Sequence, residues 1–394
     1  MKKPKIRFKG FNDDWEQRKA EELCSISTGK SNTQDQIDDG KYPFYIRSDI
    51  PVRSDKYLYD CEAVITIGDG NIGKVFHYVK GKFDLHQRCY KMTDFNGILG
   101  KYYYYFFSTN FYERAMRMTA KGTVDSVRLD MISKMDIKMP KKISEQKKIA
   151  DCLTKLDNLI TLHQRKCDEI KKLKKYMLQN MFPQNDEKVP KIRFDGFTDD
   201  WEQRKLSEIA TMHARIGWQN LRTSEFLENG DYMLITGTDF VDGSINYSTC
   251  YFVNKERYEQ DKNIQIKNGS ILITKDGTLG KVALVQGLSM PATLNAGIFN
   301  IEIKNELEID NKYLFQYLKA PFLLDYVKKR ATGGTIKHLN QNILVNFPVL
   351  TPQKLEQTKI GQYFSNLDNL ITLHQRKCDE LKNMKKFMLQ NMFV

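Results

Sequence analysis

The sequence predicts an α+β protein: two mixed α/β domains, separated by two long antiparallel helices that form a coiled coil, with an internal pseudo-two-fold repeat. The first observation behind this prediction is a duplicated tail, because Leu156–Phe182 and Leu367–Phe393 are identical at 23 of 27 positions. The second is a duplicated opening, because Pro4–Lys19 and Pro190–Lys205 are identical at 14 of 16 positions. Between these repeated ends the two halves barely resemble each other.

The repeats also set the expected boundaries along the 394 residues. We expect a first mixed domain, a first spacer helix, a second mixed domain and a second spacer helix, at residues 1–142, 143–184, 185–351 and 352–394. The offset between the copies rises from 186 residues at the openings to 211 at the tails, so the second copy carries 25 extra residues in its middle. We call the repeated openings and tails the frame; the two halves therefore differ in length and sequence in the middles that lie between these repeats.

The tails are predicted to be helical because their apolar residues recur every three or four positions and no Gly or Pro interrupts them. Each helix would be roughly 55–60 Å long at 1.5 Å per residue. Such an apolar stripe needs a partner, and we expect each helix to pack against its own repeat, with His163 and His374 as polar residues of the seam. The residues expected at the helix pair or its partner interface are Leu156, Leu159, Ile160, Ile170, Leu173, Met177, Leu367, Leu370, Ile371, Leu381, Met384 and Met388.

The divergent middles combine short β-rich runs with helical stretches. The runs are expected at 63–67, 74–79, 270–274 and 281–285, and the helices at 99–120 and 311–330. The aromatic run Tyr102–Phe107 could stack on bases, but at helical spacing we favour a place in the core.

Composition narrows the class of partner. Lys and Arg outnumber Asp and Glu by 62 to 49, and the net charge of +13 favours a polyanion, with nucleic acid first. The seven cysteines contain no Cys-x-x-Cys pair, which favours reduced thiols in a cytoplasmic protein and argues against a metal site. No apolar stretch approaches the length of a membrane span or of a signal sequence, so we expect neither secretion nor membrane insertion.

A glycine-rich turn occurs in both halves, as IGDGNIGKV at Ile67–Val75 and TKDGTLGKV at Thr274–Val282. The first copy nearly matches a phosphate-binding P-loop, but Val75 stands where Ser or Thr would bind Mg²⁺, and Lys275 replaces the first glycine of the second copy. We therefore predict a tight turn between two strands, in which Asp bonds the local backbone. Its lysines would project toward phosphates or bases.

A second matched pair, KGTV at 121–124 and GGTI at 333–336, precedes each tail. Its small residues beside basic ones suit either a connecting loop or a close approach to DNA, and we weigh these equally. The expected DNA-binding residues are Thr28, Lys30, Ser31, Asn71, Lys74, Lys121, Thr123, Arg215, Trp218, Gln219, Arg222, Lys275, Thr278, Lys281, Thr335, Lys337 and His338. By residue type, Lys30, Arg215 and Arg222 suit guanine, and Asn71 and Gln219 suit adenine.

Signatures of catalysis are missing from the sequence. It contains no Asn-Pro-Pro-aromatic tetrapeptide for a flipped adenine, no convincing cofactor turn, no His-Glu-x-x-His and no Gly-x-Ser-x-Gly. We accordingly expect no catalytic residues and no metal ligands in this chain.

The approach to each tail is distinctive, reading PKKISEQKKIADCLTKLDNLI at Pro140–Ile160 and PQKLEQTKIGQYFSNLDNLI at Pro352–Ile371. With the repeated opening and the glycine-rich turn, it resembles the specificity subunit of type I restriction–modification systems over essentially the whole chain. The resemblance implies two target-recognition domains that read the halves of a bipartite, asymmetric site in double-stranded DNA. It also implies two methyltransferase subunits that carry S-adenosylmethionine and methylate adenine at N6.

The same resemblance implies restriction subunits that translocate and cleave DNA. No cofactor is expected in this chain, and S-adenosylmethionine, ATP and Mg²⁺ would reside in the partner subunits. Two other classes stay open on the residues alone: a self-contained DNA-modifying enzyme of unrecognised type, and an assembly scaffold that does not touch DNA. Activity of the isolated chain would favour the enzyme, and indifference of the recognised site to a change of middle domain would favour the scaffold.

Overall fold

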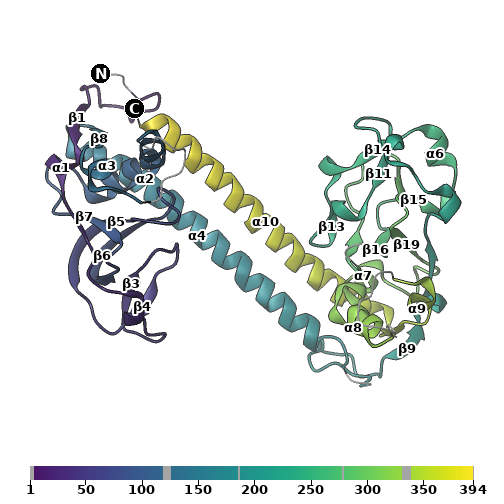
Figure 1. The fold of residues 1–394 in the computed structure, drawn as a ribbon. Coiled ribbons are helices and arrows are strands. Elements are labelled where there is room, and N and C mark those ends of the chain that lie inside the picture. The colour runs from purple at the N-terminus through teal and green to yellow at the C-terminus, as the bar shows by residue number, and fades with distance from the viewer. Residues whose placement is uncertain (1–3, 119–125, 185–186, 277–278, 331–338, 394) are drawn as a thin grey trace. The chain divides into compact units, whose positions relative to one another are not determined.

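The computed structural model describes residues 4–118, 126–184, 187–276, 279–330 and 339–393. The chain divides into two units, residues 1–165 with 374–394 and residues 166–373. Each unit holds one mixed domain and a part of both long helices, α4 (Ile143–Asn180) and α10 (Lys354–Met392), which Figure 1 shows in teal and yellow. The first unit is therefore discontinuous in sequence, and each repeated helix contributes residues to both units.

The first unit is built on a six-stranded sheet in the order β2-β7-β5-β6-β3-β4. Its strands are β2 (Ser25–Thr28), β3 (Tyr42–Tyr45), β4 (Val52–Ser54), β5 (Tyr59–Ile67), β6 (Phe76–Leu85) and β7 (Cys89–Thr93). All neighbours are antiparallel except β3 and β6, which are parallel. The connection between β5 and β6 runs from Thr66 to Phe76, so it is a wide loop rather than the tight turn that the sequence predicts.

Helix α2 (Gly100–Arg117) packs its aromatic residues into the core of this unit. Tyr103 is fully buried and stacks on Phe107 with ring centroids 5.5 Å apart. The aromatic run is therefore core and offers no exposed stacking platform, as its helical spacing indicates. The unit also contains α1 (Ala20–Leu23), α3 (Leu129–Ser133), and the pair β1 (Glu16–Lys19) and β8 (Asp136–Met139).

The second unit has two four-stranded sheets, β10-β19-β16-β17 and β14-β11-β18-β15. The first contains β10 (Ala210–His213), β16 (Ile271–Thr274), β17 (Val282–Leu284) and β19 (Ile298–Ile303). The second contains β11 (Tyr232–Ile235), β14 (Tyr251–Val253), β15 (Gln265–Ile266) and β18 (Ala292–Leu294). Short pairs join β12 (Phe240–Val241) to β13 (Ser244–Ile245) and β9 (Glu202–Lys205) to β20 (Pro348–Thr351).

The helical stretch expected at 311–330 is confirmed, but the chain divides it at Ala320 into α7 (Asn311–Lys319) and α8 (Pro321–Arg330). Pro321 has no N–H to donate, and it forces the preceding residue out of the helical region. Ala320 accordingly has φ −65° and ψ 160°. The remaining helices of this unit are α5 (Leu206–Ile209), α6 (Lys255–Glu259) and α9 (Gln341–Val345).

The repeated opening anchors the first turn of each long helix through one buried Arg–Glu ion pair. Arg7 donates from Nε and Nη2 to Glu145 at 2.7 and 2.9 Å, and from Nη2 to the Asp13 carbonyl at 2.7 Å. In the second unit, Arg193 makes the same three bonds to Glu356 and to the Asp199 carbonyl, at 2.8, 2.9 and 2.7 Å. Burial of both glutamates makes these pairs costly to break, since removing one partner leaves an uncompensated charge.

The repeated tail closes the opposite end with an aromatic side chain. Phe182, just after α4, is fully buried in the second unit, stacked on Phe364 at 5.8 Å and edge-on to Trp201 at 6.3 Å. Phe393, just after α10, lies 5.6 Å from both Tyr102 and Phe106 in the first unit. Each core therefore depends on the end of one repeated helix.

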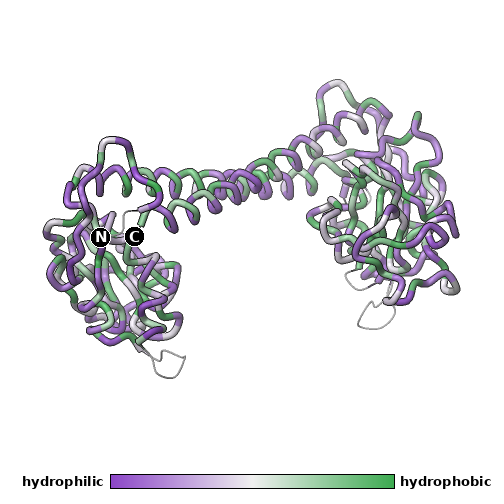
Figure 2. Tube along the Cα trace, turned by 90° about the horizontal axis from the view of Figure 1, so that it is seen from above, coloured by the Kyte–Doolittle hydropathy of each residue, from purple (hydrophilic) through white to green (hydrophobic). Residues whose placement is uncertain are grey.

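Within each unit, the two long helices contact one another through polar pairs as well as apolar residues. In the first unit Asp157 pairs with Lys385 at 2.5 Å, and His163 and His374 share a hydrogen bond between their Nδ1 atoms at 2.9 Å. Asp157 pairs with residue 385 and His163, further along α4, pairs with residue 374, so the two helix segments are antiparallel. Figure 2 shows hydrophobic and hydrophilic residues interspersed along both helices, as this arrangement requires.

Lys174 is the buried member of the equivalent pair in the second unit. Its Nζ lies 2.6 Å from Asp368 Oδ1, and only 8% of its side chain is exposed. Burial, together with the nearby Lys319, lowers the pKa of Lys174 to about 8, although Asp368 opposes this change. The basic face of the helix is thus not entirely solvated.

The helix-end aromatic residue should dominate the stability of its unit. Replacing Phe182 with Ala should lower the free energy of unfolding by about 3–5 kcal/mol, because the cavity cannot collapse among five rings. Hydrogen exchange followed by mass spectrometry should place the lost protection in the second unit. Phe387→Ala, at a side chain 55% exposed, is the control and should change stability little. A uniform loss in both units would contradict the assignment.

Lys174 should give stability a measurable dependence on pH. The folded protein binds this proton less tightly than the unfolded chain, so between the folded pKa of about 8 and the ordinary value of 10.5 the unfolded state holds more protons and stability rises with pH. The difference in unfolding free energy between wild type and Lys174→Met should rise over that interval by up to roughly 3 kcal/mol, at about 1.4 kcal/mol per pKa unit. Denaturant titrations across pH 7–10.5 measure it, with Lys385→Met as the matched variant. A difference independent of pH would refute the prediction.

Candidate nucleic-acid interface

The segments singled out in the first half converge on one turn, His86–Cys89. Gly29 N donates to Cys89 O, and Lys30 N and Ser31 N both donate to Leu85 O, each at 3.1 Å. On the other side of the turn, Gly68 N donates to Arg88 O at 2.7 Å. We call 27–31, 68–74, 86–89 and 126–127 the first loop cluster.

Residues 126–127 belong to this cluster and come shortly after the KGTV motif at 121–124. Val127 N donates to Gly68 O at 2.7 Å, and Asp69 forms an isolated bridge with Ser126. Lys121 and Thr123 themselves lie outside the described residues. The backbone therefore brings residues 27–31, 68–69 and 126–127 to the same end of strands β2, β5 and β7.

Three glycines shape the loop between β5 and β6. A Cβ on Gly68 would lie 2.6 Å from Arg88 O, so only glycine allows this close approach. Gly70 and Gly73 have φ of +81° and +68°, the left-handed conformation expected of this motif. The motif thus serves backbone geometry, in agreement with its failure as a P-loop.

The sequence predicts that Asp69 bonds the local backbone, but its side chain instead binds two arginines. Its carboxylate accepts from Arg47 Nη1 at 3.1 and 3.2 Å and from Arg88 Nη1 at 2.8 Å. Burial would raise the pKa of Asp69, but the hydrogen bonds from Arg88 and Arg47 outweigh it and the pKa is lowered. The loop cluster therefore carries a fixed, ionised carboxylate between two exposed cations.

Arg47 and Arg88 were missed by the sequence analysis. Arg47 follows β3 and Arg88 lies in the turn between β6 and β7, 41 positions apart in the chain. No repeat or periodic pattern marks either residue, because only the sheet order brings them to the same carboxylate. The only sequence feature that could have indicated Arg47 and Arg88 is their positive charge, and the chain has 62 Lys and Arg residues.

The other predicted residues of the first cluster divide by exposure. Thr28, Lys30, Asn71 and Lys74 are exposed, and Lys74 Nζ lies 5.7 Å from the centre of the Tyr112 ring. Ser31 is only 2% exposed and donates to Asp84 Oδ1 at 2.7 Å. Ser31 therefore anchors its segment to the end of β6 and, unlike the other four, is not exposed.

The second half repeats this backbone pattern around Lys275. Lys275 N donates to Gly297 O at 2.8 Å, as Gly68 donates to Arg88, and Leu339 N donates to Lys275 O at 2.8 Å, as Val127 donates to Gly68. Lys281 is exposed and Lys275 half-buried, with its Nζ 5.5 Å from the Phe299 ring. We call 215–222, 274–276, 279–281 and 295–297 the second loop cluster.

Arg215, expected to read guanine, is instead buried with 1% of its surface exposed. Its guanidinium donates to Leu294 O at 3.0 Å, Gln219 O at 3.2 Å and Thr293 Oγ1 at 3.4 Å, and burial lowers its pKa. Gln219, expected to read adenine, is 4% exposed. Arg215 braces the segment against β18, and Gln219 donates from Nε2 to Asp261 Oδ2 at 3.4 Å. Arg222 is exposed. Thr278, Thr335, Lys337, His338 and the side chain of Trp218 lie outside the described parts.

The twelve helix residues occupy three environments. Leu156, Leu367 and Leu381 are buried, and Ile160, Ile170, Met177, Ile371 and Met388 are half-buried. The remaining four, Leu159, Leu173, Leu370 and Met384, are 42–52% exposed. The apolar stripe is therefore wider than the seam that it was expected to fill.

The exposed part of the stripe is itself duplicated. Leu162 and Tyr176 on α4 match Leu373 and Phe387 on α10, and all four are 49–58% exposed. We call Leu159, Leu162, Leu173, Tyr176, Leu370, Leu373, Met384 and Phe387 the exposed apolar set. Large apolar side chains exposed at repeated positions are typical of an interface with another protein.

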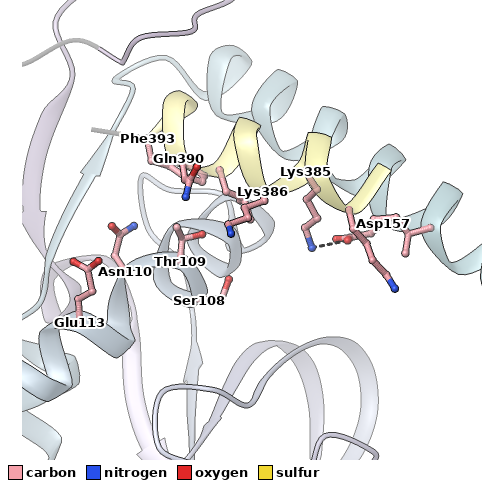
Figure 3. Close-up of a pocket in the computed structure, with 12 residues that line it drawn as sticks. Ser108, Thr109, Asn110, Glu113, Asp157, Lys385, Lys386, Gln390 and Phe393 are labelled. Carbon is pink, nitrogen blue, oxygen red and sulfur yellow. Dashed lines mark ion pairs between the residues drawn. The ribbon is translucent and has the colours of Figure 1, made fainter. Parts of the chain in front are cut away.

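The first unit has a hollow of about 720 Å³, lined by residues of α2, α4 and α10. Figure 3 shows it between α2, which contributes Thr109 and Asn110, and α10, which contributes Lys386 and Gln390, with the Lys385–Asp157 ion pair at its edge. Among the described residues, no cluster of three or more His, Cys, Asp or Glu could hold a metal ion. No described helix is both long and apolar enough to cross a membrane.

Comparison with known proteins gives one family. The model of the type I restriction modification DNA specificity domain matches residues 12–172 and again residues 198–383. A type I restriction enzyme specificity subunit of Methanocaldococcus jannaschii, MjaVIII, is 24% identical, over 95% of this chain and 91% of its own length. The EcoDI specificity subunit of Escherichia coli is 21% identical, over 96% of this chain and 88% of its own.

The fold has solved counterparts. The S subunit of a type I restriction–modification system from M. genitalium superposes with a TM-score of 0.72 at 18% identity, covering 100% of this chain and 99% of that chain. A second chain, from a study of complex assembly and conformational transition of the type I system, gives a TM-score of 0.52 at 14% identity, covering 97% and 98%. The expectation of two mixed domains in a repeated frame with long helices is confirmed.

Gly68 offers a test of the loop geometry. Gly68→Ala should destabilise the first unit by about 1–3 kcal/mol, because the new methyl group collides with the Arg88 carbonyl and the turn must move. Gly287→Ala, at a positive φ with open space around it, is the control for backbone strain alone. Thermal unfolding of both variants measures the effect. Equal losses would show that the close approach is unimportant.

Proposed function

The chain belongs to the family of type I restriction modification DNA specificity domains, and on this premise we propose that its two loop clusters read the two halves of a bipartite DNA site. It is a specificity subunit and not an enzyme, so methylation and cleavage are the work of partner subunits. Its own task is to bind double-stranded DNA of a given sequence and to bring those partners to it.

The observation that carries this proposal is the equivalence of the backbone at two loop clusters with different side chains. Gly68 and Lys275 make the same two hydrogen bonds at the same place in their domains. The surrounding residues differ: Arg88 in the first domain corresponds to Gly297 in the second, and Asn71 corresponds to Thr278 in the sequence. Two equivalent platforms with unlike side chains would read two unlike half-sites, so the whole site would be asymmetric.

Charge supports DNA as the ligand. The chain carries a net +13, and the exposed residues Lys30, Lys74, Arg222 and Lys281 lie in the loop clusters, where they would contact phosphates or bases. Thr28 and Asn71 are exposed beside them and would add polar contacts. Lys121, Thr123, Trp218, Lys275, Thr278, Thr335, Lys337 and His338 remain part of the proposed DNA-binding set, while Ser31, Arg215 and Gln219 act as braces.

The exposed apolar set supports two copies of one partner. Each repeated helix exposes four large apolar residues at matching positions, so a protein that binds one helix has an equivalent site on the other. We assign these sites to two methyltransferase subunits, which would hold S-adenosylmethionine and methylate adenine at N6. Restriction subunits, with ATP and Mg²⁺, would join the same complex, and this chain would hold no cofactor.

A domain exchange tests the assignment of one half-site to each domain. Replacing residues 20–135 with the middle of another family member should change one half of the methylated sequence and leave the other half intact. Ending the exchange at Met135 keeps the β1–β8 pair and therefore the frame. Sequencing that detects modified adenines in DNA from cells with either chain provides the measurement. An exchange that changes both halves, or neither, would exclude separate readers.

Single and paired substitutions test the number of partners. Tyr176→Asp should reduce the complex from two methyltransferase subunits to one, and Tyr176→Asp with Phe387→Asp should remove both, because a charge in an apolar contact is costly. Mass photometry of the mixed subunits counts them directly. Asn383→Asp, an exposed polar position on α10, is the control for added charge. If the single variant loses both copies, or the double variant keeps both, the two sites are not equivalent.

A further inference from the structure

Three residues from separate segments form a polar group at the centre of the first loop cluster. Asp69 comes from the loop after β5, Arg47 from the segment after β3 and Arg88 from the turn before β7. The side chain of Asp69 is 15% exposed, whereas those of Arg47 and Arg88 are 47% and 63% exposed. The carboxylate thus lies beneath two guanidinium groups that face solvent.

The backbone holds this group firmly in place. Gly68 N donates to the carbonyl of Arg88 at 2.7 Å, so the residue before Asp69 is bonded to one of its arginines. Asp69 also bridges to Ser126, and Val127 N bonds to Gly68 O. A rigid carboxylate restricts the rotamers of both arginines before any ligand binds, which reduces the entropy that binding must overcome.

The arginines keep hydrogen-bonding capacity for a ligand. Asp69 accepts only from the Nη1 atom of each, and within the described parts of the chain no other protein acceptor takes the remaining guanidinium N–H groups. Two guanidinium charges against one carboxylate leave the group with a net charge of +1. It therefore attracts an acceptor-rich, electron-rich partner rather than a cation.

The geometry distinguishes between a base and a phosphate as that partner. A phosphate accepts hydrogen bonds from many directions, and flexible Lys or Arg side chains suffice to hold it. Guanine presents O6 and N7 side by side in the major groove, and the fork of an arginine reaches both atoms only from a fixed direction. An arginine held by a half-buried, backbone-anchored carboxylate has that fixed direction.

We propose that Arg47 and Arg88 read guanine in the half-site of the first domain, and that Asp69 is the positioning residue for both. This inference rests on the function proposed above and adds to it the base that one domain prefers. The second loop cluster has Gly297 where the first has Arg88, so its half-site is read by other side chains. Two arginines held by one carboxylate thus belong to one half of the site.

The test selects DNA from a pool of randomised duplexes with the complex of the full chain and its methyltransferase subunit, and sequences the bound fraction. Arg47→Ala and Arg88→Ala should each reduce the preference for guanine at a position of one half-site on the order of 10- to 100-fold, the value of a bidentate pair. The other half-site should keep its preferences. Both arginines are exposed, so the variants should fold as the wild type does.

Asp69→Asn separates positioning from binding. It should weaken the guanine preference at the same positions, while binding to unrelated DNA stays equal or increases, because a negative charge is lost. A purely structural role would instead weaken binding to all sequences together. Lys80→Ala, an exposed cation on β6, is the control for loss of charge alone and should leave every base preference unchanged.

Three results would overturn the inference. Arginine variants that bind all sequences more weakly with unchanged base preferences would assign Arg47 and Arg88 to phosphates. Variants that change nothing would remove them from the reading surface, and variants that alter a preference for another base would refute the assignment to guanine. A wild-type complex without preference in either half would instead refute the proposed function itself.

Discussion

The frame depends on the burial of one aromatic side chain at the end of each repeated helix. Phe182 closes the core of the second unit and Phe393 that of the first, each beside a tryptophan or tyrosine from the mixed domain. The start of each helix is held by a buried Arg–Glu pair from the repeated opening. Each helix is thus held at its start by an ion pair with the repeated opening and at its end by packing in the core of a mixed domain. These contacts explain why the opening and the tail occur twice with few changes.

This constraint leaves the loops free to differ. The two hydrogen bonds at Gly68 recur at Lys275 through backbone atoms only, so the residues around them can carry different side chains in the two domains. The first domain uses this freedom to set two arginines on Asp69, and the second inserts a further sheet and buries Arg215. A constant backbone platform with variable side chains is how one frame can carry two specificities.

The sequence predicts the parts of the fold that local patterns control. The long helices follow from apolar spacing and the absence of Gly and Pro, and the break at Pro321 follows from a residue that the 311–330 prediction overlooked. Exposure along the helices could not be predicted, because the stripe has more apolar residues than the seam can cover and Leu173 looks the same as Leu367 in a periodic pattern. Likewise, residue type alone suggests that Arg215 reads DNA and says nothing of Arg47, since burial and convergence are set by strand order.

If this chain alone determines which DNA sequence the complex modifies, removing the chain must change the methylation of the host genome. The most direct measurement is a genome-wide map of modified adenines in the host, made with the chain present, deleted and restored. Deletion should abolish methylation at one bipartite, asymmetric sequence and leave all other modified sites unchanged, and restoration should return it. An unchanged map after deletion, or loss at a palindromic sequence, would contradict this account.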